Sequence, residues 1–328
     1  MTIPQILIRT FGPLLGSGRY TDQMTDEQLE LRTLDSKLRI ILPPEYQASY
    51  EDVQPVSMGS AGLKFDPAGR VAWDEIWESF CDLAMAGGPP HKGNLLEPGT
   101  KDQIEQQPDR YRTVVQEICR GIRMVSDLAV EPSQNAGWVR VMCFDRVTAG
   151  WLVRAIVMEN VSARMQGNVV ELPAGPRFRV EKEVKNVITA VAKTYHYFDG
   201  HIASGQRRQI GAIFAQAEAK SPLLQPCDEP SSDAGKTRLA EKLFELTGLP
   251  MGRVEYRGWM GLETASVRSA IWMMRALAVS NVLARREGTL LYVPVNPVAD
   301  PEGEVLVSAV SAAHRLATAR GLFRQDTN

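Results

Sequence analysis

The sequence has little of what marks several large classes of protein. Its four cysteines are widely separated and form no C-x-x-C pair, so neither a zinc ribbon nor a disulfide framework is indicated; they are Cys81, Cys119, Cys143 and Cys227. No apolar run approaches the roughly eighteen residues that a membrane-spanning helix needs. The formal charge is −2, so there is no basic excess to attract nucleic acid or an anionic membrane. We therefore expect neither of these partners.

The first residues, "MTIPQILIRTFGPLLGSG", have no basic stretch ahead of the apolar one, so no export signal is predicted. Unpaired cysteines favour a reducing compartment, and we expect a cytoplasmic protein. The apolar content of 44 % and the charged content of 23 % are typical of a globular chain. With 328 residues, the chain can bury one large core or two smaller ones.

Two segments of the chain repeat each other without a gap. They are "WLVRAIVMENVSARMQGNVVELP" from Trp151 and "WMMRALAVSNVLARREGTLLYVP" from Trp272. A fainter third copy, "WESFCDLAMAGGPPHKGNLLEP", starts at Trp77. The spacing from the tryptophan to a glycine is sixteen residues in all three copies. Internal repeats of this kind determine the fold, so they precede any single motif in importance.

The repeats predict an α/β fold with three internal strand-helix-strand-helix units. Each copy reads as a helix that ends at a left-handed glycine, such as Gly167 or Gly288, followed by a short buried strand. We expect parallel strand pairing inside each unit. The three copies fit either one mixed sheet or a pseudo-threefold arrangement. The predicted divisions are 1–62 (N-terminal helix and edge strands), 63–132 (repeat 1), 133–200 (repeat 2), 201–250 (helical insertion) and 251–328 (repeat 3).

Further elements are predicted from local patterns. Residues 25–38 favour a helix, followed by a strand at Arg39–Leu42. Second helices are expected at 112–125, 180–197 and 304–323, and strands at 168–173 and 289–294. The segment Gly235-Lys236-Thr237 resembles the end of a phosphate-binding loop, but Pro230 stands where that motif requires glycine. We interpret it as a helix start capped by Asp233.

Histidine is scarce, and no catalytic triad can be assembled from four residues by spacing. His196, Asp199 and His201 could supply two nitrogens and a carboxylate to a metal. Histidines at a helix end more often compensate the helix dipole or form hydrogen bonds, so no metal site is predicted. The sequence identifies no cofactor.

Several basic and amide residues recur in the copies. Lys92, Arg164 and Arg285 precede the repeat glycines, and either cap helices or surround an anion. Arg154 and Arg275 stand on nearly all-apolar helices, where each either packs its stem on a tryptophan or binds an anion. Two further residues, Asn160 and Asn281, either complete local hydrogen bonds or contact a ligand.

The loops that differ among the copies carry the candidate chemistry. Asp145 and Glu263 are the predicted proton-transfer groups of an enzyme that acts on a small anionic substrate. Predicted substrate-binding residues donate hydrogen bonds or carry positive charge; they are Arg146, Thr148, Arg177, Arg179, Thr264, Arg154 and Arg275. Each of the loop residues also suits an ordinary helix cap, so only their convergence in one cleft would support catalysis.

Two other functions fit the same residues. A non-catalytic scaffold or homo-oligomer would show a large exposed apolar patch and no cleft with perturbed carboxylates. A small-ligand sensor would have the cleft but no carboxylate within reach of the ligand. Whether the chain is an enzyme, and on which substrate, is left open by the sequence.

Overall fold

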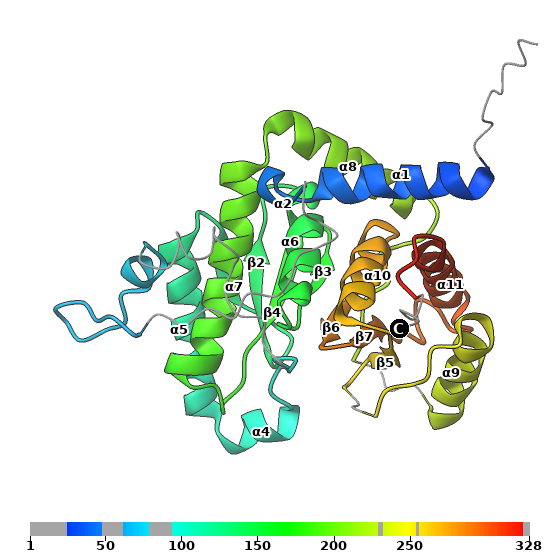
Figure 1. Cartoon of the computed structure of the whole chain (residues 1–328). Helices are drawn as coiled ribbons and strands as arrows, with labels where there is room; N and C mark the ends of the chain where they lie inside the picture. The colour runs from blue at the N-terminus through cyan, green and yellow to red at the C-terminus, as the bar shows by residue number, and fades with distance from the viewer. Residues whose placement is uncertain (1–24, 48–61, 79–93, 229–231, 254–255, 324–328) are drawn as a thin grey trace, which may run out of the picture.

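The computed structural model describes residues 25–47, 62–78, 94–228, 232–253 and 256–323. Helices and strands alternate along the chain and form two α/β units that lie beside each other (Figure 1). One continuous apolar core runs through both units, with Ile118 and Leu172 from the first and Leu277 and Leu291 from the second. None of the described helices combines the length and apolar character needed to cross a membrane.

The first unit has a four-stranded antiparallel sheet with strand order β1-β2-β4-β3. Helix α6 packs against β3 and β4, and α5 packs against β1, β2 and α7. The elements are α4 (Lys101–Gln106), α5 (Pro108–Val125), β1 (Ala129–Pro132), β2 (Trp138–Met142), α6 (Arg146–Met158), β3 (Arg164–Gln166), β4 (Val169–Pro173) and α7 (Lys185–His196).

The second unit repeats this order with a three-stranded antiparallel sheet, β5-β7-β6. Its elements are α9 (Asp233–Thr247), β5 (Trp259–Glu263), α10 (Val267–Val279), β6 (Arg285–Glu287), β7 (Leu290–Pro294) and α11 (Glu304–Ala319). Helix α10 packs against β6, β7 and α11. The bridge from Met251 to Leu262 takes the place of the pairing between Val130 and Val141 in the first unit.

A short extended segment completes each unit by a parallel bridge. Leu96 pairs with Val161, and Leu224 pairs with Val282 in the same way. The predicted alignment of the three internal copies places the residues around Leu96 opposite β4 and β7. In the structure they correspond instead to the residues around Leu224. The predicted copy that starts at Trp77 falls largely in residues 79–93, outside the described residues. Two units are therefore seen, and a third copy stays a prediction.

The predicted parallel pairing is wrong, because each pair of named strands is antiparallel. The predicted helix end at Gly167 is also wrong: α6 stops at Met158, and Gly167 lies in the tight turn between β3 and β4 with φ of +62°. The left-handed residue that follows the helix is Asn160, with φ of +57°. Asparagine tolerates this conformation better than other side chains, so Asn160, two residues after Met158, turns the chain away from the helix.

Helices outside the two units span both of them (Figure 1). Helix α1 (Asp26–Ile41) packs against α10 and against α8 (Ser204–Glu218), and the indole Nε1 of Trp151 donates to the Ile41 carbonyl at 2.9 Å. The strand predicted at Arg39–Leu42 is instead the last turn of α1. A short helix, α2 (Pro44–Gln47), follows. Two π-helical turns flank α7: η1 (Val180–Val184) and η2 (Tyr197–His201).

Candidate functional site

Arg154 connects the two units through buried hydrogen bonds. Its guanidinium donates to the Ala278 carbonyl at 3.0 Å, the Asn281 side-chain oxygen at 2.6 Å and the Gly150 carbonyl of its own helix at 2.6 Å. The Phe214 ring lies 3.9 Å from the guanidinium carbon. Burial lowers the pKa of Arg154 to about 10. The N–H groups of this predicted substrate-binding residue therefore donate to acceptors of the protein itself.

The two repeated asparagines also join the units. The Asn160 amide donates to the Arg286 carbonyl at 2.9 Å, and its oxygen accepts from Arg285 at 3.2 Å. Asn281 donates to the Ser221 carbonyl at 2.7 Å and accepts from Arg154. Both asparagines are buried. These contacts match the structural interpretation of the repeated amides, as hydrogen-bonding groups that fix the helix ends and the interface.

The predicted proton-transfer groups lie near the starts of equivalent helices, α6 and α10, but at different positions, because Ser266 stands where Asp145 does. Asp145 caps α6, and one oxygen of its carboxylate, Oδ1, accepts from both the backbone N–H and the hydroxyl of Thr148 at 2.7 Å. Glu263 is the exposed last residue of β5. Thr264 donates its hydroxyl to the Ser266 and Thr289 carbonyls, while Ser266 caps α10.

The predicted arginines of the loops lie at the surface. Arg146 pairs with Glu218 at 3.0 Å, and Arg179 pairs with Glu183 at 3.1 Å. Arg177 is exposed, and Arg275 is half-buried on α10. None of these four residues lines the cavity that holds Asp145. The predicted set is thus divided among several places in the fold.

Asp145 and Thr148 line a cavity of about 490 Å³ between the starts of α6 and α8, called here the α6–α8 cavity. Tyr195 and Asp199 come from the end of α7 and from η2, and Arg207 and Arg208 come from α8. Arg207 donates to the Asp199 carboxylate at 3.2 Å and to the Ile202 carbonyl at 2.8 Å. Within the described part of the chain, Arg208 forms no ion pair, and it is exposed. Its positive charge is not held in an ion pair, although the two arginines and two aspartates that line this cavity balance in formal charge.

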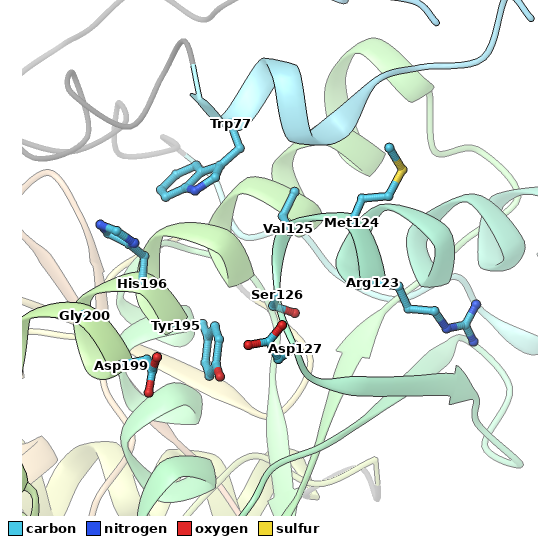
Figure 2. Close-up of a pocket in the computed structure, with 10 residues that line it drawn as sticks. All are labelled: Trp77, Arg123, Met124, Val125, Ser126, Asp127, Tyr195, His196, Asp199 and Gly200. Carbon is cyan, nitrogen blue, oxygen red and sulfur yellow. The ribbon is translucent and has the colours of Figure 1, made fainter.

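A second cavity of about 270 Å³ shares Tyr195 and Asp199 with the first (Figure 2). We call it the Trp77 cavity. Trp77, from helical residues 73–78, lies on one side of it, and His196 and Asp127 lie on others. The Arg123 side chain extends away from these residues in Figure 2, and it donates to the Val130 carbonyl.

Electrostatics differ between the two cavities. Burial, followed by the charges of Asp199 and Asp127, raises the pKa of Tyr195, so this phenol stays protonated at neutral pH. The Trp77 cavity thus combines aromatic rings with carboxylates. The α6–α8 cavity adds guanidinium groups to its carboxylates, which suits a ligand that carries negative charge.

The π-helical turn η2 brings two histidines together. Residues five apart lie about 140° apart around an α-helix, but a π-turn closes after five residues and puts His196 and His201 on one side. Their Nε2 atoms are 3.3 Å apart. Among the described residues, no group of three or more His, Cys, Asp or Glu side chains could hold a metal ion.

His196 predicts a pH dependence of stability. Burial, and then the neighbouring His201, lower the pKa of His196, with Asp199 opposing in part. The folded pKa lies below the unfolded value of about 6.5, so stability is complete above that pH. We expect it to fall as the pH drops from 6.5 toward the folded pKa, by no more than about 1.4 kcal/mol per pH unit for one proton.

Urea unfolding between pH 7.5 and 5 tests this expectation, with His196→Gln as the variant. The substitution should flatten part of the pH dependence. Burial also lowers the pKa of His314, so protonation of His314 reduces the free energy of unfolding at low pH in both the parent and the variant. If the variant and the parent show the same pH profile, protonation of His196 is not disfavoured by folding.

Several residues of the two cavities were not predicted from sequence. Tyr195, Arg207 and Arg208 lie about fifty to sixty residues beyond Asp145 in the chain, and no motif connects them to it. In the sequence, Asp199 stands out only as a neighbour of His196 and His201. The clustering of Tyr195 to His201 at a helix end was the one available signal.

Comparison with known proteins found no matching family model, no similar curated sequence and no similar solved structure. The roles of the residues above therefore depend on the geometry alone.

Proposed function

We propose that the chain is an enzyme that acts on a small anionic substrate in the α6–α8 cavity. The observation that carries the proposal is the meeting of Asp145 and Thr148 with the arginines of α8 around one cavity of about 490 Å³. Cavities of this size hold small metabolites. A guanidinium binds carboxylate and phosphate groups through paired N–H donors.

Asp145 is the proposed proton-transfer group. Both of its hydrogen bonds to Thr148 end on Oδ1. The other oxygen, Oδ2, is the atom that would take a substrate proton, while the cap holds the carboxylate in place. Arg208 would hold the anionic group of the substrate, and Tyr195 would donate a hydrogen bond from its protonated phenol.

Two variants separate binding from proton transfer. Asp145→Asn keeps an equally good helix cap, so it should bind the ligand and lose at least about 100-fold in turnover. Arg208→Gln should abolish the rise in melting temperature that inorganic phosphate or succinate causes in the parent. Arg177→Gln, also exposed but outside the cavity, is the matched control and should leave this rise unchanged.

Sodium chloride at equal ionic strength is the reference in these melts. If neither phosphate nor succinate stabilises the parent beyond chloride, the small-anion function is wrong. Ligand binding that depends on Arg208, with turnover intact in Asp145→Asn, would overturn the proton-transfer role alone. Binding with no turnover for any ligand would indicate a sensor.

A second candidate, a self-associating or interaction protein, is favoured by exposed apolar side chains in the second unit. Phe244 and Leu246 of α9 and the nearby Met251 are 53–60 % exposed. Sedimentation equilibrium of the parent and of Phe244→Ser/Leu246→Ser tests this function. A monomeric parent, or an oligomer that the double variant leaves unchanged, would contradict a role for these residues in self-association.

A further inference from the structure

Arg285 has two buried donors that bond to nothing. Its side chain is fully buried, and neither Nε nor Nη2 has a hydrogen-bond partner. The remaining nitrogen, Nη1, donates to Glu287 at 2.6 Å and to Asn160 at 3.2 Å. Nε and Nη2 form one edge of the guanidinium, the edge that accepts a carboxylate with two parallel hydrogen bonds. Buried polar atoms normally have partners, so this empty edge needs an explanation.

The first unit shows what fills that edge. Arg164 on β3 is opposite Glu171 on β4, just as Arg285 on β6 is opposite Tyr292 on β7. The Nε of Arg164 donates to Glu171 at 2.6 Å, and its Nη1 donates to Asp228 at 2.6 Å. In the second unit, the Nη1 of Arg285 also donates to a carboxylate, that of Glu287. The carboxylate that accepts from Nε in the first unit, Glu171, is replaced by Tyr292.

Aromatic rings enclose the guanidinium of Arg285. The rings of Tyr292, Tyr256 and Trp259 have their centroids 4.0, 4.4 and 5.3 Å from its central carbon. Rings satisfy the face of a guanidinium but offer no acceptor to its edge. Burial, and then the neighbouring Glu287, raise the pKa of the Tyr292 phenol to about 12, so this hydroxyl lies beside Glu287.

We propose that the Nε/Nη2 edge of Arg285 is a binding site for the carboxylate group of a ligand. The ligand supplies an acceptor to each of Nε and Nη2, whereas Glu171 supplies one only to the Nε of Arg164. Of the three rings, that of Tyr256 is partly exposed, whereas those of Trp259 and Tyr292 are buried. A ligand would have to enter on the Tyr256 side, because this ring is the least buried of the three.

The charges around Arg285 accommodate one more carboxylate. Arg164 holds two carboxylates, and Arg285 holds only that of Glu287. Glu97, which accepts from the Arg257 backbone N–H at 3.3 Å, also lies in the field of Arg285. Burial raises the pKa of Glu97, so its negative charge is less favoured than that of an exposed glutamate. The site shares no lining residue with the α6–α8 cavity and does not depend on the function proposed for it.

Thermal denaturation of the full chain in sodium formate and sodium acetate tests the site, with sodium chloride at equal ionic strength as the reference. Wild-type protein should show a melting temperature that rises with carboxylate concentration and exceeds that in chloride. Tyr292→Glu places a carboxylate where Glu171 stands in the first unit. It should raise the melting temperature without formate or acetate and remove their effect.

Tyr292→Phe is the matched control, because it removes the hydroxyl but leaves the edge empty, and it should keep the response. Arg208→Gln should also keep it, which separates this site from the α6–α8 cavity. The proposal is wrong if chloride and formate stabilise the wild type equally, or if Tyr292→Glu folds and still responds. Should Tyr292→Glu fail to fold, ¹⁵N-arginine spectra of wild type decide: a buried Nε–H signal must move with formate, and no movement overturns the site.

Discussion

Replacement of Arg154 by alanine is expected to lower the free energy of unfolding by about 3 kcal/mol. Three hydrogen bonds from a charged donor contribute about 1.5–3 kcal/mol each, and two of them end on the other unit. Burial opposes them, since it lowers the pKa of Arg154 to about 10 and so disfavours the charged guanidinium. The hydrogen bonds exceed this cost, and alanine also leaves a cavity beside Phe214.

Arg146→Ala is the matched control for this prediction. Arg146 lies on the same helix but is mostly exposed, and it only pairs with Glu218. Exposed ion pairs contribute about 0–1 kcal/mol, so this variant should unfold almost like the parent in urea. Equal losses for the two variants would show that Arg154 does not hold the units together.

A double-mutant cycle locates the effect at the interface. Asn281 has φ of +65°, which glycine adopts without strain, so Asn281→Gly removes the acceptor and keeps the backbone. Arg154→Ala and Asn281→Gly should together cost clearly less than the sum of the single losses, since they remove one shared hydrogen bond. Additive losses would contradict a direct coupling.

The sequence predicted those elements whose signal is local. The helices expected at 112–125, 180–197 and 304–323 correspond to α5, α7 with its flanking π-turns, and α11. The strands expected at 168–173 and 289–294 are β4 and β7. Long periodic runs and short β-branched runs determine such elements without help from distant residues.

The pairing of the strands could not be predicted in the same way. Strand β3 is only three residues long, and its residues continue the pattern of α6 in a way that also suits a helix. In the sequence, α6 and β3 therefore appear as one element. This merged pattern predicts a helix end at Gly167, although Asn160 carries the alternative stop signal. With β3 missing, the hairpin to β4 disappears, and strand-helix alternation favours parallel pairing.

The candidate sites show a similar division. Asp145 and Thr148 could be predicted together because an acid and a hydroxyl stand in one short loop at a helix start, where a cap commonly accepts from the residue three positions later. Arg207 and Arg208 reach the same cavity from a helix that begins about sixty residues later, and only the tertiary fold brings them there. The difference between Glu171 and Tyr292 is visible in the aligned repeats, but its meaning depends on the strand register that puts each opposite an arginine.

The second large effect is expected for Gly137→Ala, at about 3 kcal/mol or more. Gly137 has φ of +90°, which costs roughly 1–2 kcal/mol for a residue with a side chain. An added Cβ would lie 2.7 Å from the Gly99 carbonyl oxygen, so the backbone must move. That movement would strain the bonds from the Ala174 N–H to the Gly137 carbonyl, at 2.7 Å, and from the Gly99 N–H to the Ala174 carbonyl, at 2.9 Å.

Gly167→Ala separates the two causes, because Gly167 has φ of +62° but open space around its Cβ position. We expect it to cost about 1 kcal/mol, the conformational part alone. The second unit repeats the close approach, since a Cβ on Gly258 would lie 3.1 Å from the Cys227 carbonyl oxygen. Gly258→Ala should therefore lose an amount of stability between those of Gly167→Ala and Gly137→Ala in urea unfolding. If all three variants lose the same stability, the extended segments at Gly99 and Cys227 do not pack against the glycines as described.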